Sequence, residues 1–179
     1  MRYTDRPEYK LYKALRKGQL DIAQSFIQQG CNIHRVTEND KWTYLHQMFM
    51  SPSTRTEDRT PIETIQFLIE QGLDVNAVDS YGYTPLIYAV RQKNLPAIKL
   101  LLENGAEKLI NHRPEDGATP LKMVFGSKPY SSEIVAVLLE AGADPDAKIE
   151  SGSSFRNSVA VLADMPPEIP ELLRSYPEK

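Results

Sequence analysis

Apolar positions recur with helical spacing in four segments of the chain. In each segment, three apolar side chains lie seven, four and three residues before a glycine. This spacing is typical of a helix buried along one face, and a glycine in the left-handed conformation commonly ends such a helix. The pattern therefore predicts four equivalent helices. Their apolar sets and glycines are Ala23, Phe26, Ile27 and Gly30; Ile65, Leu68, Ile69 and Gly72; Ile98, Leu101, Leu102 and Gly105; and Val135, Leu138, Leu139 and Gly142.

A second signal precedes these helices. Thr84-Pro85-Leu86 and Thr119-Pro120-Leu121 each place a capping hydroxyl before a proline, which favours a helix start; Thr43-Tyr44-Leu45-His46 is the same signal without the proline. The chain is thus expected to be one domain of helix pairs. We place its five units at about 5–36, 37–78, 79–112, 113–148 and 149–179.

The terminal units are expected to be degenerate, because each has one face without a neighbour. The first lacks the capping threonine. In the last, Ser154–Ala163 can form a helix, Pro166 and Pro167 break it, and Glu168–Tyr176 can form a short final one.

On these residues the chain resembles the ankyrin-repeat family, most clearly from Asp79 to Val90 and from Leu100 to Ala106. The resemblance implies an all-α solenoid of stacked helix-turn-helix units with projecting hairpin loops, first helices on the concave side and second helices on the convex side. It also implies that His46 ties neighbouring loops by hydrogen bonds. The chain departs from the family at Lys41 and Lys93, where glycine is usual.

Extra residues separate the two helices of the second unit, within 51–61, and of the fourth, near 127–132. Both insertions should lie side by side along the end opposite the hairpins. Thr60 and Glu63 have capping-box spacing, which predicts a defined helix start there. Two interpretations stay open: tolerated variation in loop length, which costs little free energy, or contact with a partner, since loops on rigid scaffolds often carry recognition.

Composition and charge exclude several functions. The 179 residues carry 21 Lys and Arg against 24 Asp and Glu, a net charge of −3, which does not favour nucleic acid. No apolar run is long enough to cross a membrane and no secretory signal is seen, so a cytoplasmic location is expected. Neither a phosphate-binding glycine loop nor a nucleophile with a positioned base is found. We expect no enzyme activity and no cofactor.

The few candidate metal ligands are weak. Cys31 and His34 form at most a local pair, and His112 with Asp116 is a poor ligand set. With a single cysteine and three scattered histidines, the sequence predicts no metal site.

The resemblance also points to partner-contact residues, at the hairpin tips and at the exposed ends of the first helices. Among them the aromatic side chains favour binding hot spots, although Trp42 or Tyr83 could instead be a structural wedge against the next hairpin. The predicted contact residues are Asn39, Asp40, Trp42, Met50, Ser80, Tyr81, Tyr83, Arg91, Gln92, Arg113, Glu115 and Asp116.

A non-enzymatic protein-binding module, monomeric when free, is therefore the expected function. The chain is similar to small bacterial ankyrin-type immunity proteins, and this similarity implies a secreted toxin as partner, bound by the concave face and blocked sterically. The alternative is an adaptor or scaffold that links proteins without inhibiting them.

Overall fold

The computed structural model describes residues 6–50, 55–148 and 152–176, and these form helices and loops without a β-strand. The α-helices come in five antiparallel pairs, with short 3-10 helices in some of the connections. The bounds are α1 (Pro7–Arg16), α2 (Leu20–Gln28), α3 (Tyr44–Met48), η2 (Thr56–Asp58), α4 (Ile62–Glu70), α5 (Pro85–Arg91), α6 (Leu95–Glu103), η3 (Ala106–Leu109), α7 (Pro120–Met123), η4 (Val124–Gly126), α8 (Ser132–Glu140), α9 (Phe155–Val161) and α10 (Glu168–Arg174).

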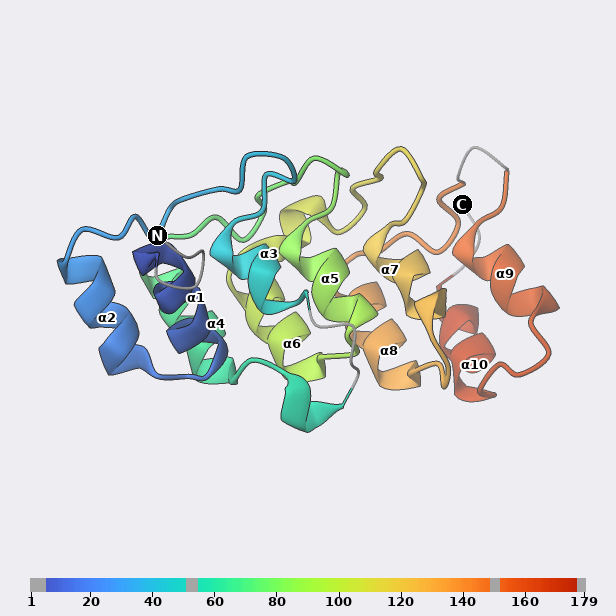
Figure 1. Ribbon diagram of the computed structural model, residues 1–179. Helices are drawn as coiled ribbons and strands as arrows, with labels where there is room; N and C mark the ends of the chain where they lie inside the picture. The colour runs from blue at the N-terminus through green and yellow to red at the C-terminus, as the bar shows by residue number, and fades with distance from the viewer. Residues whose placement is uncertain (1–5, 51–54, 149–151, 177–179) are drawn as a thin grey trace.

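The helix pairs stack side by side into an elongated solenoid (Figure 1). The first helices α1, α3, α5 and α7 contact one another in order, and among the second helices α4 packs against α6. The pair α9 and α10 closes the far end, with α10 against α8. The long loops that join successive pairs all project from one edge of the stack, which is the upper edge in Figure 1.

One continuous apolar core runs through the stack. The positions seven residues before each glycine, Ala23, Ile65, Ile98 and Val135, are completely buried. The positions three residues before it lie nearer the rim: of these only Leu139 is buried, whereas Ile27, Ile69 and Leu102 are half-buried. Because each pair buries its apolar stripe only against its neighbours, stacking is a condition of stability.

Backbone geometry at the predicted turns follows the sequence signals. The four helix-ending glycines have φ between 80° and 102°, in the left-handed region. Lys41 and Lys93, where the family usually has glycine, also have positive φ, 57° and 53°. The fold therefore imposes the glycine conformation on two lysines, at a conformational cost of about 1 kcal/mol each.

The helix caps agree with the prediction at three threonines but not at a fourth. Thr43, Thr84 and Thr119 each accept a hydrogen bond from a first-turn backbone N–H. The prediction of a Thr60–Glu63 capping box is wrong. Helix α4 begins after Pro61 with no side-chain cap. The hydroxyl of Thr60 instead donates to the Met48 carbonyl at the end of α3, 3.0 Å away.

The edge opposite the hairpins is a row of tethered turns. Helix η2 lies there (Figure 1). The guanidinium of Arg59 donates to the carbonyls of Gln92 and Lys93, at 3.1 and 3.0 Å, and the Lys93 ammonium donates to the Pro129 carbonyl at 2.7 Å. The described part of the first insertion is thus bound to the neighbouring turn, and that turn to the second insertion. Residues 51–54 lie outside the described residues.

Two histidines join neighbouring hairpins. His46 is fully buried; its Nδ1 lies 3.2 Å from the Thr43 backbone nitrogen and its Nε2 lies 3.1 Å from the Tyr83 carbonyl oxygen. Since the Thr43 N–H must donate, Nε2 carries the ring proton and donates to Tyr83. The expected tie between loops is confirmed. His112 makes a similar contact with the Gly82 carbonyl oxygen at 2.9 Å.

Candidate protein-binding groove

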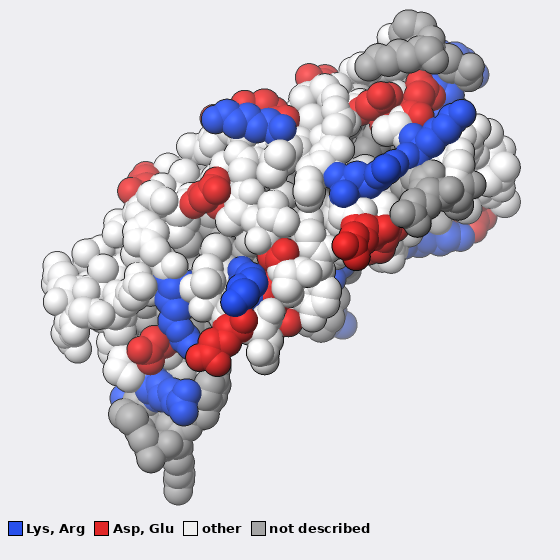
Figure 2. Space-filling model, turned by 90° about the horizontal axis from the view of Figure 1, so that it is seen from above, with Lys and Arg blue, Asp and Glu red and all other residues white. Residues whose placement is uncertain are grey.

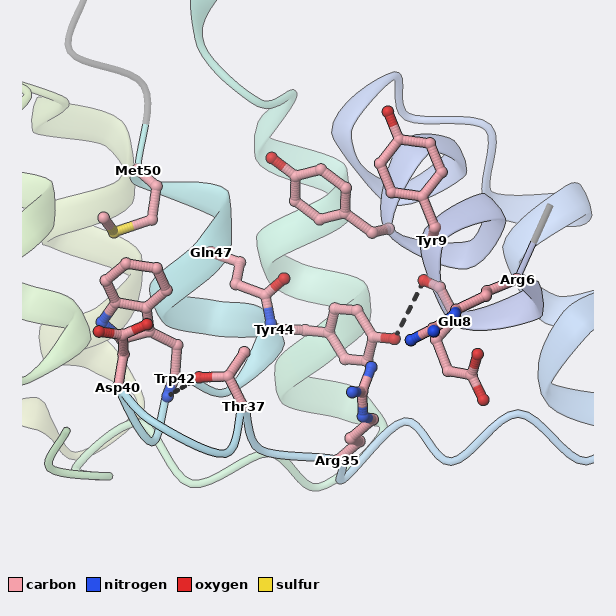
Figure 3. A pocket seen from close by; sticks show the side chains of 11 residues that line it. Arg6, Glu8, Tyr9, Arg35, Thr37, Asp40, Trp42, Tyr44, Gln47 and Met50 are labelled. Carbon is pink, nitrogen blue, oxygen red and sulfur yellow. Dashed lines mark hydrogen bonds between the residues drawn. The ribbon is translucent and has the colours of Figure 1, made fainter. Parts of the chain in front are cut away.

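Two pockets, each of about 680 Å³, lie between the hairpins and the first helices. Both are lined by Trp42 and Met50, so they adjoin and form one groove. The N-terminal pocket, drawn in Figure 3, is lined by Arg6, Glu8, Tyr9, Tyr12, Arg35, Thr37, Asp40, Trp42, Tyr44, Gln47 and Met50. The central pocket is lined by Trp42, Met50, Ser80, Tyr81, Gly82, Tyr83, Tyr88, Arg91, His112, Arg113, Pro114, Glu115 and Asp116.

The groove brings together all but two of the predicted contact residues. Asn39 is exposed on its hairpin but lines neither pocket. Gln92 was expected at the exposed end of a first helix, and this prediction is wrong: its side chain is 2% exposed. Gln92 is the residue at which α5 turns toward α6, and in that turn its carbonyl accepts a hydrogen bond from the Arg59 guanidinium at 3.1 Å.

A buried carboxylate, that of Asp79, holds several residues that line the groove. Asp79, 6% exposed, accepts four hydrogen bonds. One oxygen, Oδ1, takes the backbone N–H groups of Tyr81 and Tyr83 at 2.9 and 2.8 Å. The other, Oδ2, takes the indole N–H of Trp42 at 3.0 Å and the hydroxyl of Tyr88 at 2.6 Å. Charge-assisted bonds of this kind are the strong ones, so Asp79 fixes the position of the Trp42 ring.

Two tyrosines connect their hairpin to the hairpins on either side. Tyr81, 56% exposed, donates its hydroxyl to Asp40 of the preceding hairpin at 2.9 Å. Tyr83, half-buried, donates to Asp116 of the following one. Burial and the bond to Asp116 raise the pKa of Tyr83 to about 12, so this hydroxyl stays protonated as a donor. The rings therefore act as braces between hairpins, and they still line the groove.

Arg91 lies on a buried aromatic floor. Its guanidinium carbon is 4.6 Å from the centre of the Tyr88 ring, a cation–π distance. The Tyr88 ring in turn makes edge contacts with Tyr83 and His46, at 5.5 and 5.9 Å between ring centres. Burial, followed by the bond to Asp79, raises the pKa of Tyr88. Arg91 is exposed, lines the central pocket and is held against the Tyr88 ring.

Sequence reasoning missed most of the N-terminal pocket. Tyr9 and Tyr12 belong to α1, whose buried side holds Leu11 and Leu15. A signal was present, because two aromatic residues fall off the apolar stripe of that helix. Arg6 and Arg35 lie outside regular hairpin-tip positions, and only the folding of hairpin 29–43 against α1 brings them to one pocket.

Charge on the hairpin side of the molecule is mixed. Figure 2 shows acidic and basic side chains interspersed there, separated by uncharged surface. Within the described residues, no three His, Cys, Asp or Glu side chains gather as a metal site would require, and no helix is long and apolar enough to cross a membrane. His112 and Asp116, considered above as a ligand pair, bind Gly82 and Tyr83 instead.

Stacked helix pairs with projecting hairpins and a groove along the first helices define a helical-repeat solenoid. The pattern of the family described as "Ankyrin repeats (3 copies)" matches residues 11–112 and 63–149. The chain belongs to the ankyrin-repeat family, which is a family of protein–protein interaction modules and generally of non-enzymatic scaffolds.

Several curated proteins share this region. Zygote-specific protein 3 of Chlamydomonas reinhardtii is 35% identical over 113 residues, which is 63% of this chain and 28% of that protein. Neurogenic locus notch homolog protein 1 of Danio rerio is 31% identical over 142 residues, 79% of this chain and 5% of that protein. An ankyrin repeat, SAM and basic leucine zipper domain-containing protein 1, from Neofelis nebulosa, is 31% identical over 48% of this chain and 18% of its own length. The chain thus spans less than a third of these relatives.

Proposed function

We propose that the groove is the partner-binding surface of this protein and that the partner is another protein. The observation that carries the proposal is that three aromatic side chains and one arginine line a single groove: Trp42, Tyr81, Tyr83 and Arg91. Each of them is held in place by a neighbouring side chain: Asp79, Asp40, Asp116 and Tyr88, respectively. Preorganised aromatic and arginine side chains lower the entropic cost of binding and dominate binding hot spots.

The more specific proposal is an immunity protein. In this mechanism the groove clamps a cognate toxin and covers its active site or its substrate path, so that inhibition is steric and requires no chemistry from this chain. The support for this is the similarity to small bacterial ankyrin proteins on which the expectation was based.

The alternative is an adaptor that joins two proteins, which requires a second surface. One observation favours it. A hollow of about 380 Å³ lies on the second helices, away from the groove, and its apolar lining comes from Leu20, Ile62, Phe67 and Leu100. An adaptor would use both surfaces at once, whereas an immunity protein needs only the groove.

The test of groove binding is capture of a partner by the wild type and by a Trp42→Ala, Tyr81→Ala, Tyr83→Ala variant. We expect loss of capture in the variant, since each central aromatic contact is worth on the order of 2 kcal/mol. A Tyr81→Phe, Tyr83→Phe variant is the matched control: it removes the braces to Asp40 and Asp116 but keeps the rings. Far-ultraviolet circular dichroism checks that each variant is folded. Undiminished capture by a folded triple variant would place the binding surface elsewhere.

The immunity proposal has its own test, which is co-expression with the product of an adjacent gene. Rescue of the cells by the wild type and not by the triple-alanine variant is the expected result. If the product of the adjacent gene is not toxic, or if it stays active in a complex with this protein and a third protein, the adaptor hypothesis replaces the immunity hypothesis.

A further inference from the structure

Positive charge is concentrated at the start of the chain. Residues 1–60 contain ten Lys and Arg against seven Asp and Glu, whereas residues 61–179 contain eleven against seventeen. The net charge of −3 thus conceals a basic first third and an acidic remainder.

Helix α1 contributes much of this basic character. Its buried side holds Leu11, Ala14 and Leu15, and Lys10, Lys13 and Lys17 are exposed. Within Pro7–Arg16 the one acidic residue is Glu8. Lys10 and Lys17 form no ion pair with a described residue. The exposed side of α1 is therefore positively charged, and its Lys13 ammonium lies 5.9 Å from the centre of the Tyr9 ring, which lines the N-terminal pocket.

Two arginines from different elements meet inside that pocket. Figure 3 shows the guanidinium groups of Arg6 and Arg35 directed to the same corner, next to the Tyr44 ring, whose hydroxyl donates to the Glu8 carbonyl at 3.4 Å. Both arginines are exposed, and Arg35 forms no ion pair with any residue of the described ranges. An exposed guanidinium without an ion pair favours an anionic ligand, so Arg35 is the group on which such a ligand would bind.

The rest of the pocket offers hydrogen-bond donors beside apolar ring faces. Tyr9 and Tyr12 stand on one wall, with ring centres 6.3 Å apart, and Trp42 and Met50 form the opposite wall. Of the two carboxylates in the lining, Asp40 accepts the Tyr81 hydroxyl at the far end. The pocket therefore suits a ligand that carries negative charge next to an apolar or aromatic group.

We propose that the N-terminal pocket binds an acidic segment of the partner protein. A carboxylate side chain of that segment pairs with Arg35, and a neighbouring apolar side chain packs between the tyrosines and Trp42. This inference rests on the proposed function and adds the chemistry of the partner and the direction in which it lies. Each of the two pockets is lined by two arginines and two carboxylates, so the acidic segment is assigned to the α1 end because of the exposed lysines of that helix and because Arg35 has no ion pair among the described residues. A nucleic acid fits less well, because a continuous row of phosphates would also meet Glu8 and Asp40 in the lining, whereas one carboxylate side chain need approach only Arg35.

The experiment is selection of short random peptides displayed against the full chain. The expected result is enrichment of sequences with net negative charge that include an aromatic or large aliphatic residue. Their binding should weaken about tenfold or more in an Arg35→Glu variant, because a reversed charge repels the carboxylate. It should also weaken with added salt, since exposed charges are screened. Lys108→Glu is the matched control, the same reversal at an exposed position outside both pockets, and should leave binding unchanged.

Three results would overturn the inference: enriched peptides without net negative charge, acidic peptides that bind the Arg35→Glu variant as well as the wild type, or tighter binding of a single-stranded oligonucleotide than of any selected peptide. Peptides of another composition whose binding is lost in the Trp42→Ala, Tyr81→Ala, Tyr83→Ala variant would leave the groove as the binding surface and remove only the acidic segment. Binding unaffected by that variant would remove the proposed function itself.

Discussion

At the scale of single residues, the buried His46 both caps a helix and connects two repeats. His46 satisfies its own helix start through Thr43 and the next hairpin through Tyr83. Lys41 and Lys93 have positive φ, a backbone conformation that favours glycine and is strained for lysine. The Lys93 ammonium also donates a hydrogen bond to the Pro129 carbonyl. Local preference is overruled in both lysines because the neighbouring units fix the path of the chain.

The buried state of His46 predicts a pH dependence of stability. Burial lowers the pKa of His46 below 6.5, its ordinary value in the unfolded chain. Between those two values the unfolded state binds more protons, so the contribution of His46 to stability is complete above about pH 6.5 and is lost as pH falls toward the lowered pKa. Urea denaturation of the wild type should therefore give a smaller free energy of unfolding at about pH 5.5 than at about pH 7.5.

A His46→Gln variant provides the comparison, because glutamine does not titrate. It should be less stable than the wild type at the higher pH, since the fully buried site is disturbed, and the gap between the two proteins should narrow at the lower pH. An equal slope for both proteins across this range would mean that His46 does not carry the dependence.

At the scale of elements, the hairpins form a braced row. Each brace crosses from one repeat to the next: Trp42 to Asp79, Tyr81 to Asp40, and Tyr83 to Asp116. The sequence left open whether Trp42 and Tyr83 are contact residues or wedges. In the structure each ring bonds a neighbouring hairpin through its polar atom and also lines the groove, so a bracing role is compatible with the predicted contact role. A rigid row of this kind limits how far the hairpins can spread apart.

Asp79→Asn tests the central brace. An amide offers one acceptor atom where the carboxylate offers two, and its NH₂ faces the donors of either Trp42 and Tyr88 or Tyr81 and Tyr83. We expect a loss of about 3 kcal/mol in the free energy of unfolding and a red shift in the fluorescence of Trp42, the single tryptophan. Asp74→Asn is the matched control: Asp74 is exposed and accepts one bond, from the Asn76 N–H. A smaller effect at Asp79 than at Asp74 would contradict the role assigned to it.

At the scale of the whole molecule, the solenoid transmits stability from neighbour to neighbour, so each end needs its own closure. At the far end, Arg156 of α9 makes a two-pronged bond to Asp146, at 2.6 and 3.0 Å, and donates to the Leu173 carbonyl at the end of α10 at 2.9 Å. One guanidinium thereby joins the last hairpin to both helices of the terminal pair.

Arg156→Ala should therefore loosen the last repeat without unfolding the rest. We expect amide hydrogen exchange in α9 and α10 to accelerate about tenfold or more, because bonds to a charged group contribute about 1.5–3 kcal/mol, while α1 to α6 keep their protection. Arg174→Ala, at an exposed position of α10, should change little. Uniform acceleration along the chain would show that the repeats unfold as one unit.

The repeat could be predicted from the amino-acid sequence, because the interactions that produce each helix pair are local. Apolar side chains at helical spacing, capping threonines and helix-ending glycines encode each helix pair, and the recurrence of one pattern indicates stacking. The prediction of the Thr60–Glu63 capping box was wrong because the Thr60 hydroxyl donates instead to a carbonyl distant in sequence, that of Met48.

The groove could not be predicted in this way, because it arises from the packing of adjacent repeats. Gln92 is buried and Arg35 lies beside Arg6 because of how adjacent repeats fold over one another, and no spacing along the chain records this. The Asp79 network likewise joins residues 37 positions apart. Helices are specified by near neighbours in sequence, whereas a binding surface is made by side chains from several repeats, and their meeting depends on the angles and offsets with which whole units pack.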